Sequence, residues 1–493
     1  MAGGGTAGWM MASLLGRHFE RQPVVVTVVE SSEIATVGVG EATVPAIREY
    51  FSEIGVDSYD VMRATQGTIK LGIEFEGWAR PGERFFHPFG MYGAADRGVP
   101  FHQYWLRLRQ SGDRTPLEAY NLCTALARAN RFQPAPGNPK ADMEIYRWAV
   151  HFDAVLFARY LSEFAQRSLG VRRVDAKIVD VRLRGRDGFI ESLQLDSGQT
   201  LAGDLFIDCT GFRALLLGQA LGVRYCNWGD VLPCDRAVAM PCARSQLLTP
   251  YTRSTARTAG WQWRIPLQHR IGNGYVYSST HISDDEAVQT LKSSLEGEPL
   301  GDPNFIRFNA GRREKFWEKN CIAAGLAAGF MEPLESTSIT LIQTAGERLL
   351  GLFPERDCNR TLADEFNRQT GLEYERIRDF LVLHYFANGR RGEPFWDECR
   401  QRAPAEHLAR KIHLFLDSGR LVNYEWETFF HPSWLSMYAG FEIQPDRYDR
   451  RADFYTLDEL RAGFALMRAD IEKAVSTATP HAEFLAQHCA AAS

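Results

Sequence analysis

The chain has 493 residues, 45% of them hydrophobic, and a formal net charge of −5 at neutral pH. This size predicts roughly two or three globular lobes, and the mild acidity offers no electrostatic footprint for nucleic acid or for an anionic membrane. No apolar stretch approaches the ~18 residues that span a bilayer, and the first residues lack the features of a signal peptide, so we expect a cytoplasmic protein. The 9 cysteines include no C-x-x-C pair, which argues against a disulfide framework and against a bound metal.

Two regions of the chain differ in pattern. Residues 1–350 combine a glycine-rich start with apolar, β-branched runs, which predict a mixed α/β body of the nucleotide-binding kind. Residues 351–493 show mostly helical spacing, and we expect these helices to cover the body and close a substrate cavity. Strands are expected at 24–30, 177–184 and 204–211, and helices at 9–19, at 362–385 and in segments that begin near 405 and 457.

A G-x-G-x-x-G pattern opens the chain. Such glycines permit a tight turn and bring the backbone close to a pyrophosphate at the start of the following helix. The expected helix, an apolar strand and then Glu30, an acid at the distance that suits a ribose hydroxyl, follow in order. The alternative is a glycine linker, but this context favours a dinucleotide site. The loop residues predicted to contact the cofactor are Gly3, Gly5, Thr6, Ala7 and Gly8.

Two further features bear on that site. The glycine fingerprint normally follows a β-strand, yet only Met1 and Ala2 precede Gly3, so we expect the first strand to be missing and hypothesise a misassigned or trimmed start. A missing strand would weaken both the sheet and the affinity for the cofactor. Asp208 ends an apolar run and is followed closely by glycine, like strand ends that approach the cofactor in FAD monooxygenase-type folds. A turn after a buried strand explains this pattern almost as well.

Four segments, taken with the glycine loop, make the chain resemble the flavin-dependent tryptophan halogenase family. They are GVGEAT at 38–43, TIKLGI at 68–73, WQWRIP at 261–266 and EPLEST at 332–337. The resemblance runs from Gly3 through at least Trp396. It implies an α/β, FAD-binding Rossmann-type fold of the aromatic-hydroxylase and halogenase kind, with a mainly helical C-terminal substrate lobe. It also implies cofactor contacts at Gly40, Glu41, Ala42, Thr43 and Gly325.

The resemblance assigns catalytic roles to Lys70 and Glu335. Lys70 lies in the run 69–75, where apolar and other residues alternate as in a half-buried strand, so we expect its side chain to point away from the apolar face. A single lysine is most often solvated, and a glutamate near a helix start is often a surface cap. The match to the family segments favours the catalytic interpretation of both residues.

Halide binding and a barrier between cofactor and substrate are implied by the same resemblance. Thr337 and Ser338 match the halide-binding positions, and the start of a helix suits an anion. Ser338 replaces the glycine common there, which leaves the preference for chloride or bromide open. Trp261 and Trp263 match the segment that keeps the organic substrate away from the flavin, although aromatic residues spaced by two on a strand are more often core.

The substrate pocket is predicted from aromatic residues in two regions. His87 and Phe89 match the family segment that stacks on an indole ring, and a loop with a buried Phe is the alternative. By rough alignment, Phe429, Phe430 and Trp434 complete the sandwich. The chain lacks a Tyr-Tyr pair that tryptophan-specific members use to hold the amino-acid backbone, which argues against free tryptophan as the substrate.

The sequence thus predicts an FADH2-dependent halogenase that uses O2 and chloride or bromide to halogenate an indole or a related electron-rich aromatic. Hypohalous acid would form at the flavin, and Lys70 and Glu335 would direct the halogen. Because only one dinucleotide fingerprint is present, a separate flavin reductase must supply FADH2. An FAD-dependent aromatic hydroxylase and a non-catalytic flavin-binding protein are the alternatives, and the oligomeric state, including a homodimer, is left open.

Overall fold

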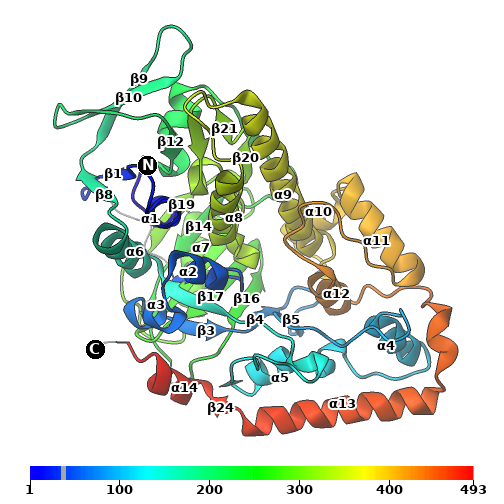
Figure 1. Ribbon diagram of the computed structural model, residues 1–493. Coiled ribbons are helices and arrows are strands. Elements are labelled where there is room, and N and C mark those ends of the chain that lie inside the picture. The colour runs from blue at the N-terminus through cyan, green and yellow to red at the C-terminus, as the bar shows by residue number, and fades with distance from the viewer. Residues whose placement is uncertain (35–39, 246, 492–493) are drawn as a thin grey trace.

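The computed structural model describes residues 1–34, 40–245 and 247–491. Parallel strands around the N-terminus form the predicted nucleotide-binding sheet (Figure 1). The strand β1 (Thr27–Glu30) pairs in parallel with β8 (Arg172–Asp175), and β12 (Phe206–Asp208) pairs in parallel with β22 (Cys321–Ala323). The short antiparallel strand β21 (Trp317–Glu318) completes this edge.

The two halves of this sheet are joined by the residues that precede the glycine loop. Ala2 makes parallel bridges to both Val29 and Asp208, and its backbone N–H donates to the carbonyl of Ile207 at 2.9 Å. The backbone N–H of Gly3 donates to the carbonyl of Val29 at 2.8 Å. A single bridged residue therefore takes the central place where the sequence lacks a regular first strand.

The predicted helix is present as α1 (Thr6–His18), but it begins within the glycine motif, three residues before the expected start at Trp9. Gly3 has a φ of +99°, which favours glycine, and a Cβ there would lie 2.3 Å from the carbonyl oxygen of Cys209. A Cβ on Gly8 would lie 1.9 Å from the carbonyl oxygen of Gly3, whereas a Cβ on Gly5 would meet no atom within 4 Å. Gly3 and Gly8 thus permit close packing of the loop, and Gly5 faces open space.

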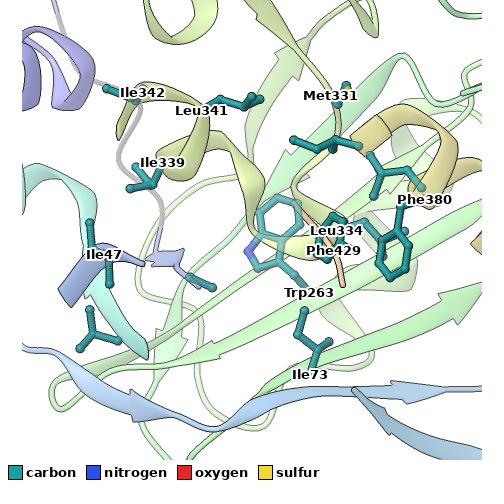
Figure 2. Packing of buried hydrophobic residues seen from close by; sticks show 14 of the residues in the cluster. Ile47, Ile73, Trp263, Met331, Leu334, Ile339, Leu341, Ile342, Phe380 and Phe429 are labelled. Carbon is teal, nitrogen blue, oxygen red and sulfur yellow. The ribbon is translucent and has the colours of Figure 1, made fainter. Parts of the chain in front are cut away.

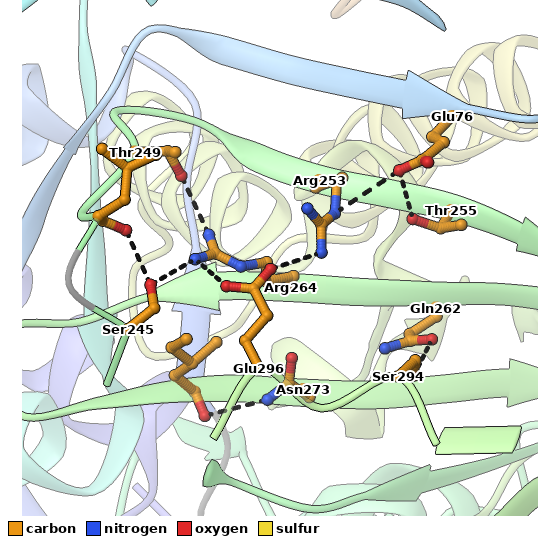
Figure 3. Close-up of polar contacts among 12 residues, drawn as sticks. Glu76, Ser245, Thr249, Arg253, Thr255, Gln262, Arg264, Asn273, Ser294 and Glu296 are labelled. Carbon is orange, nitrogen blue, oxygen red and sulfur yellow. Dashed lines mark hydrogen bonds and ion pairs between the residues drawn. The ribbon is translucent and has the colours of Figure 1, made fainter. Parts of the chain in front are cut away.

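A larger, mostly antiparallel sheet forms the centre of the molecule. Side chains alternate between its faces, so Trp261 and Trp263 point to one side and Gln262 and Arg264 to the other. Figure 3 shows Arg264 bound to Thr249 at 3.0 Å and to Glu296 at 2.8 Å on this second face. The strand order is β19 (Asn304–Arg307), β14 (Arg236–Ala239), β18 (Arg270–Tyr277), β17 (Gly260–Pro266), β16 (Thr252–Arg257), β4 (Gly72–Glu76) and β5 (Arg84–Pro88), with β15 (Cys242–Ala243) on β18.

Smaller sheets and helices complete the α/β body. The small sheets are β2 (Gly40–Ala42), β7 (Ala149–Asp153) and β3 (Thr68–Lys70); β11 (Thr200–Ala202), β10 (Ile190–Leu195) and β9 (Ile178–Leu183); and β13 (Tyr225–Asn227), β20 (Gly311–Arg313) and β23 (Gly329–Phe330). The helices are α2 (Ile47–Ile54), α3 (Ser58–Ala64), α4 (Phe101–Gln110), α5 (Leu122–Arg128), α6 (Ala154–Ser168), α7 (Asp284–Lys292) and α8 (Thr337–Gly351).

Helices dominate the C-terminal part, as the sequence predicts. They are α9 (Arg360–Phe386), α10 (Pro394–Gln401), α11 (Glu406–Ser418), α12 (His431–Gly440), α13 (Leu457–Thr477) and α14 (His481–His488). The chain then returns to the body, because β24 (Thr479–Pro480), which follows α13, pairs with β6 (Arg131–Phe132). Within the described ranges, no helix combines the length and the apolarity that crossing a bilayer requires.

The segment around Lys70 differs from its prediction. Instead of one half-buried strand, it forms β3, which pairs with β7, and then β4, which pairs with β5 and β16. All residues from 68 to 75 are buried. The prediction of a half-buried strand is wrong because distant segments cover its second face, and alternation along the sequence cannot show this.

Replacing Gly8 by Ala tests the close packing of the glycine loop. We expect Gly8→Ala to lower the free energy of unfolding by about 1–3 kcal/mol, because its methyl group would overlap the Gly3 carbonyl. Gly5→Ala is the matched control and should unfold like the wild type in urea. Equal stability of all three proteins would contradict the packing described for this loop.

Candidate active site

Lys70 ends β3 with its side chain wholly inside the protein, at 0% exposure. Its ammonium donates to the carbonyl oxygen of Thr43 at 2.8 Å and to the hydroxyl of Ser336 at 2.8 Å. The Phe89 ring centroid lies 5.2 Å from the Lys70 nitrogen, within the range of a cation–π contact. The solvated-lysine alternative is therefore excluded.

Burial lowers the pKa of Lys70 to about 7 from its ordinary value of 10.5, because the ammonium loses its hydration. The negative charge of Glu335 acts in the opposite direction and limits this fall in pKa. At neutral pH, a substantial fraction of the Lys70 side chains is consequently the neutral amine. A neutral amine is a nucleophile, which an ordinary solvated lysine at this pH is not.

Glu335 is also buried, at 1% exposure, and two histidines from distant elements hold it. The Nδ1 of His87, on β5, lies 3.0 Å from one carboxylate oxygen, and the Nε2 of His384, on α9, lies 3.0 Å from the other. Burial alone would raise the pKa of Glu335, but the charges and hydrogen bonds of His87 and His384 outweigh it and lower the pKa to about 2. Glu335 is therefore a carboxylate throughout the neutral range.

His384 contacts a backbone carbonyl and the carboxylate of Glu335 at the same time. Its Nδ1 lies 2.8 Å from the backbone carbonyl of Phe380, and a carbonyl can only accept. Its Nε2 faces the carboxylate of Glu335, which also accepts when ionised. The His384 ring is thus held between the backbone of its own helix and Glu335.

Ser336 joins the lysine to the glutamate along the backbone. It lies between the short 3-10 helix Pro333–Glu335 and α8, with the left-handed angles φ 61° and ψ 36°. Such a conformation costs about 1–3 kcal/mol for a residue other than glycine and is concentrated at functional sites. It turns the chain so that Glu335 faces the histidines while the Ser336 hydroxyl accepts from Lys70.

A cavity of about 270 Å³ lies beside this pair and extends to the glycine loop. It fits the predicted FAD site, because the N-terminus of α1 supplies backbone N–H groups without an acidic residue in the first turn. Gly38 and Val39 of the family segment lie outside the described residues. The predicted residues that line the cavity are Gly5, Thr6, Ala7, Gly40, Glu41, Ala42, Trp261, Trp263, Gly325, Thr337 and Ser338.

Glu41 lies in the wall of the cavity, on β2. Burial raises the pKa of its carboxyl to about 7, and no charged group offsets this effect among the residues that the structure describes. Glu41 therefore presents a carboxyl that is partly neutral at physiological pH. A neutral carboxyl suits a site that must also accept an anionic cofactor and a halide.

Five residues predicted to contact the cofactor lie outside the cavity lining. Gly3 and Gly8 serve the packing of the loop, and the Thr43 carbonyl accepts from Lys70. Glu30 ends β1 as predicted, and it accepts from Trp9 at 3.2 Å and pairs with Arg173. The predicted contact of Asp208 with the cofactor is corrected, because both oxygens of its carboxylate accept hydrogen bonds within the turn after β12.

Asp208 shows that an acidic residue at the end of a strand can stabilise a local turn instead of contacting a ligand. Its side chain is 0% exposed and accepts hydrogen bonds from the backbone of Thr210, Leu216 and Leu217 and from the Thr210 hydroxyl. The turn that the sequence offered as an alternative is therefore present, and its following residues Cys209 and Gly211, rather than Asp208, reach the cavity wall.

The two tryptophans of the W-x-W segment stand in the cavity wall that faces the helical lobe. Trp261 donates to Glu332 at 2.9 Å, and Tyr385 of α9 donates to the same carboxylate oxygen at 2.6 Å. Burial raises the pKa of Glu332 to about 7. In Figure 2, Trp263 lies between Ile339 on α8 and the ring of Phe380. Trp261, Trp263 and Leu334 all line the cavity.

The aromatic cluster contains most of the predicted substrate residues. Phe429 stacks on Phe380 with ring centroids 4.0 Å apart, and Trp434 meets Phe380 edge-on at 5.0 Å. His87 lies 6.2 Å from Phe429 and 6.5 Å from Phe89. The structure thus brings His87, Phe89, Phe429 and Trp434 together, next to Lys70 and Glu335.

Phe430 does not join the cluster. Its side chain is 58% exposed, since Phe430 caps the start of α12 and its carbonyl accepts from Ser433 and Trp434. The prediction that Phe430 contacts the substrate is therefore corrected: only one of the two adjacent phenylalanines faces inward, as expected where the chain turns into a helix.

Three residues of the site were missed by the sequence analysis. Phe380 and His384 are four residues apart and so share one face of α9, a spacing that predicted burial but no specific role. Ser336 lies inside the recognised EPLEST segment, so its position was visible although its contact with Lys70 was not. In the described ranges, no group of three or more His, Cys, Asp or Glu side chains is arranged to hold a metal ion.

Comparison with known proteins agrees with this geometry. The tryptophan halogenase family model matches residues 1–456. Tryptophan 6-halogenase SttH from Streptomyces toxytricini is 39% identical over 436 residues, which cover 84% of this chain and 82% of the relative. The structure of BrvH, a flavin-dependent halogenase from Brevundimonas sp. BAL3, is 48% identical with a TM-score of 0.96, and it covers 99% of this chain and 98% of BrvH.

A second solved structure, Xcc4156, a flavin-dependent halogenase from Xanthomonas campestris, has a TM-score of 0.96 at 40% identity and covers 100% of this chain and 98% of Xcc4156. The fold and these comparisons therefore define an enzyme of the flavin-dependent halogenase class. The chain belongs to the tryptophan halogenase family, which confirms the resemblance found in the sequence.

Replacing Lys70 by Met tests the lowered pKa. Below pH 7 the folded protein must bury the ammonium, whereas between about pH 7 and 10.5 only the unfolded chain still binds the proton. The stability of the wild type should therefore rise with pH across this window. Lys70→Met should be more stable than the wild type by on the order of a few kcal/mol at pH 7, and this gain should shrink toward pH 10.

Urea unfolding at several pH values measures this difference. Lys292→Met, at an exposed position of α7, is the matched control and should differ from the wild type equally at every pH. A gain for Lys70→Met that does not vary between pH 7 and pH 10 would contradict the pKa described for Lys70.

Proposed function

We propose that this enzyme halogenates an indole or a related electron-rich aromatic, using reduced FAD, O2 and chloride or bromide. The observation that carries the proposal is the pair of Lys70 and Glu335, both wholly buried, linked through Ser336 and in contact with an aromatic cluster beside a cavity that fits the cofactor. The family membership favours halogenation over the hydroxylation that the same fold also supports.

The glycine loop and β2 would hold the cofactor. Gly5, Thr6 and Ala7 would place the pyrophosphate at the N-terminus of α1, and Gly40 and Ala42 would allow its close approach on the opposite wall. When bound, reduced FAD supplies with O2 the oxidising equivalent that converts halide to hypohalous acid. The apolar wall would exclude water from that chemistry.

The start of α8 would bind the halide. Thr337 and Ser338 are its first two residues and line the cavity, and no side chain caps this helix end. Unpaired backbone N–H groups and the positive end of the helix dipole favour an anion there. The neighbouring Ser336 binds Lys70, so the halide position and the lysine are connected by one residue.

Lys70 would carry the halogen to the substrate. In its neutral form, the amine attacks the halogen of HOX: an N–X bond forms, the O–X bond breaks, and hydroxide leaves as water with the proton released by the nitrogen. The pKa of about 7 supports this route, because a fully protonated ammonium has no lone pair. The aromatic ring then attacks the halogen as the N–X bond breaks, and the proton that the ring loses passes through Glu335 to the nitrogen, which restores the neutral amine.

Glu335 would accept the proton that the ring loses. Its pKa of about 2 keeps it ionised, and a carboxylate stabilises a positively charged ring intermediate beside it. His87 and His384 hold the carboxylate in place from two elements. The ring carbon held nearest Lys70 would receive the halogen, so position rather than electronic preference would determine the product.

Halogenation assays test this assignment. With indole, bromide, FAD, NADH and an added flavin reductase, mass spectrometry should show brominated indole, and the rate should exceed that with free tryptophan. Lys70→Ala and Glu335→Gln should each lower kcat by about 100-fold or more, since each removes a group that acts on the reacting atoms. A product that contains oxygen and no bromine would identify a hydroxylase instead.

The matched controls are Lys292→Ala and Glu298→Gln, two exposed positions outside the site. Both should retain wild-type rates. Full activity of Lys70→Ala would sink the proposed role of the lysine, provided that the variant binds FAD as tightly as the wild type does.

The source of reduced flavin gives an independent prediction. Because the chain has one dinucleotide fingerprint, the enzyme with FAD and NADH alone should form no halogenated product. Turnover should appear when a flavin reductase is added. NADH oxidation and halogenation by the purified enzyme without a reductase would show that this proposal is wrong.

A further inference from the structure

A second cavity, of about 410 Å³, lies next to strand β5 and is separate from the Lys70 site. Its walls come from β5, from α4 and the segment after it, and from the end of α12; these elements lie in the lower right part of Figure 1. We call it the β5–α4 cavity. Neither Lys70, Glu335 nor any residue of the aromatic cluster lines it.

The helix α12 lies between the aromatic cluster and the β5–α4 cavity. Trp434 faces Phe380 in the aromatic cluster, whereas Ser436, Ala439 and Gly440 line the β5–α4 cavity. At about 3.6 residues per turn, these three residues lie on a different face of the helix from Trp434. A molecule in the β5–α4 cavity therefore does not reach the buried lysine.

Aromatic side chains form much of the wall of the β5–α4 cavity. Phe85 projects from β5 and Trp105 projects from α4, and both are largely buried. Leu106 and Leu117 extend the apolar surface. A cavity of this volume with aromatic walls suits a small molecule that has a ring system.

The charged side chains at this cavity differ in whether they form ion pairs within the protein. Its carboxylates are paired within the protein: Glu118 binds Arg128 at 2.9 Å, and Glu83 and Glu442 both bind Arg80.

The arginines that line this cavity differ from one another in their ion pairs. Arg84 binds Glu76 at 3.0 Å, but Arg109 and Arg114 form no ion pair with any described residue. Arg109 has a 3.4 Å contact with the carbonyl of Asp113 and a cation–π contact with Trp105 at 5.7 Å. After the hydrogen bonds from Thr115, the charge of Arg109 also contributes to the lowered pKa of the Asp113 carboxyl. The cavity thus presents two guanidinium groups that form no ion pair among the described residues.

We propose that the β5–α4 cavity binds an aromatic carboxylate, with the ring against Phe85 and Trp105. The carboxylate would pair with Arg109 and Arg114, because guanidinium groups match carboxylate geometry and form strong charge-assisted hydrogen bonds. No lysine lines this cavity, so its occupant is not a substrate for the chemistry at Lys70. The proposal does not depend on the halogenase activity.

Isothermal titration with 1-naphthoate, on the whole enzyme, tests this site. Arg109→Gln/Arg114→Gln should raise the Kd by about tenfold or more, which corresponds to the loss of charge-assisted hydrogen bonds. The matched control is Arg167→Gln/Arg172→Gln, two exposed arginines on α6 and β8 without ion pairs among the described residues. This control should bind 1-naphthoate like the wild type.

Two further measurements distinguish this cavity from the indole site. Ala439→Trp fills the cavity without changing charge, and it should weaken binding as much as the double arginine variant does. Neutral 1-naphthamide should bind the wild type more weakly than 1-naphthoate, and its Kd should not respond to the arginine substitutions. Unchanged binding of 1-naphthoate by both the arginine variant and Ala439→Trp, with each variant folded by circular dichroism, would overturn the proposal.

Discussion

A buried ammonium and a buried carboxylate impose the central constraint on this protein. Removing either charge from water costs several kcal/mol, and the cost is tolerable only when hydrogen bonds and an opposite charge replace the lost hydration. The ammonium of Lys70 donates hydrogen bonds to Thr43 and Ser336, and the carboxylate of Glu335 contacts the ring nitrogens of His87 and His384. Because these partners come from separate parts of the chain, the site forms only when the body and the helical part pack together.

The same contacts explain how the cofactor cavity and the Lys70 site are distinct and yet connected. Trp261 and Trp263 form a wall of the cofactor cavity, and the hydrogen bonds of Trp261 and Tyr385 to Glu332 fix that wall to α9. Ser336 lines the cavity and also binds Lys70, so one residue spans the boundary.

Local patterns in the sequence predicted the features that depend on neighbouring residues. The glycine loop, α1 and the place of Glu30 at the end of β1 follow from short-range geometry, and the structure has all three, with α1 beginning three residues earlier than expected. The family segments located Lys70 and Glu335. The order of helices after residue 360 was visible from spacing alone.

The remaining features depend on contacts between distant segments, which spacing does not encode. Alternation around Lys70 predicted one exposed face, but β7 and the start of α8 cover it. Asp208 and Phe430 have patterns suited to a site, yet the carboxylate of Asp208 is used by a local turn and Phe430 points to solvent. Conversely, His384 resembles an ordinary buried helix residue until α9 packs over Glu335.

The protonation of Lys70 tests this account most directly. In protein labelled with ¹³C at the lysine side chain, the Lys70 signal can be assigned by its absence from Lys70→Met, and its chemical shift can be followed with pH. A midpoint near pH 7, with the other lysines titrating near their ordinary value, is the expected result. A Lys70 signal that titrates with the solvated lysines would show that the ammonium is hydrated, and the buried pair on which the mechanism depends would not exist.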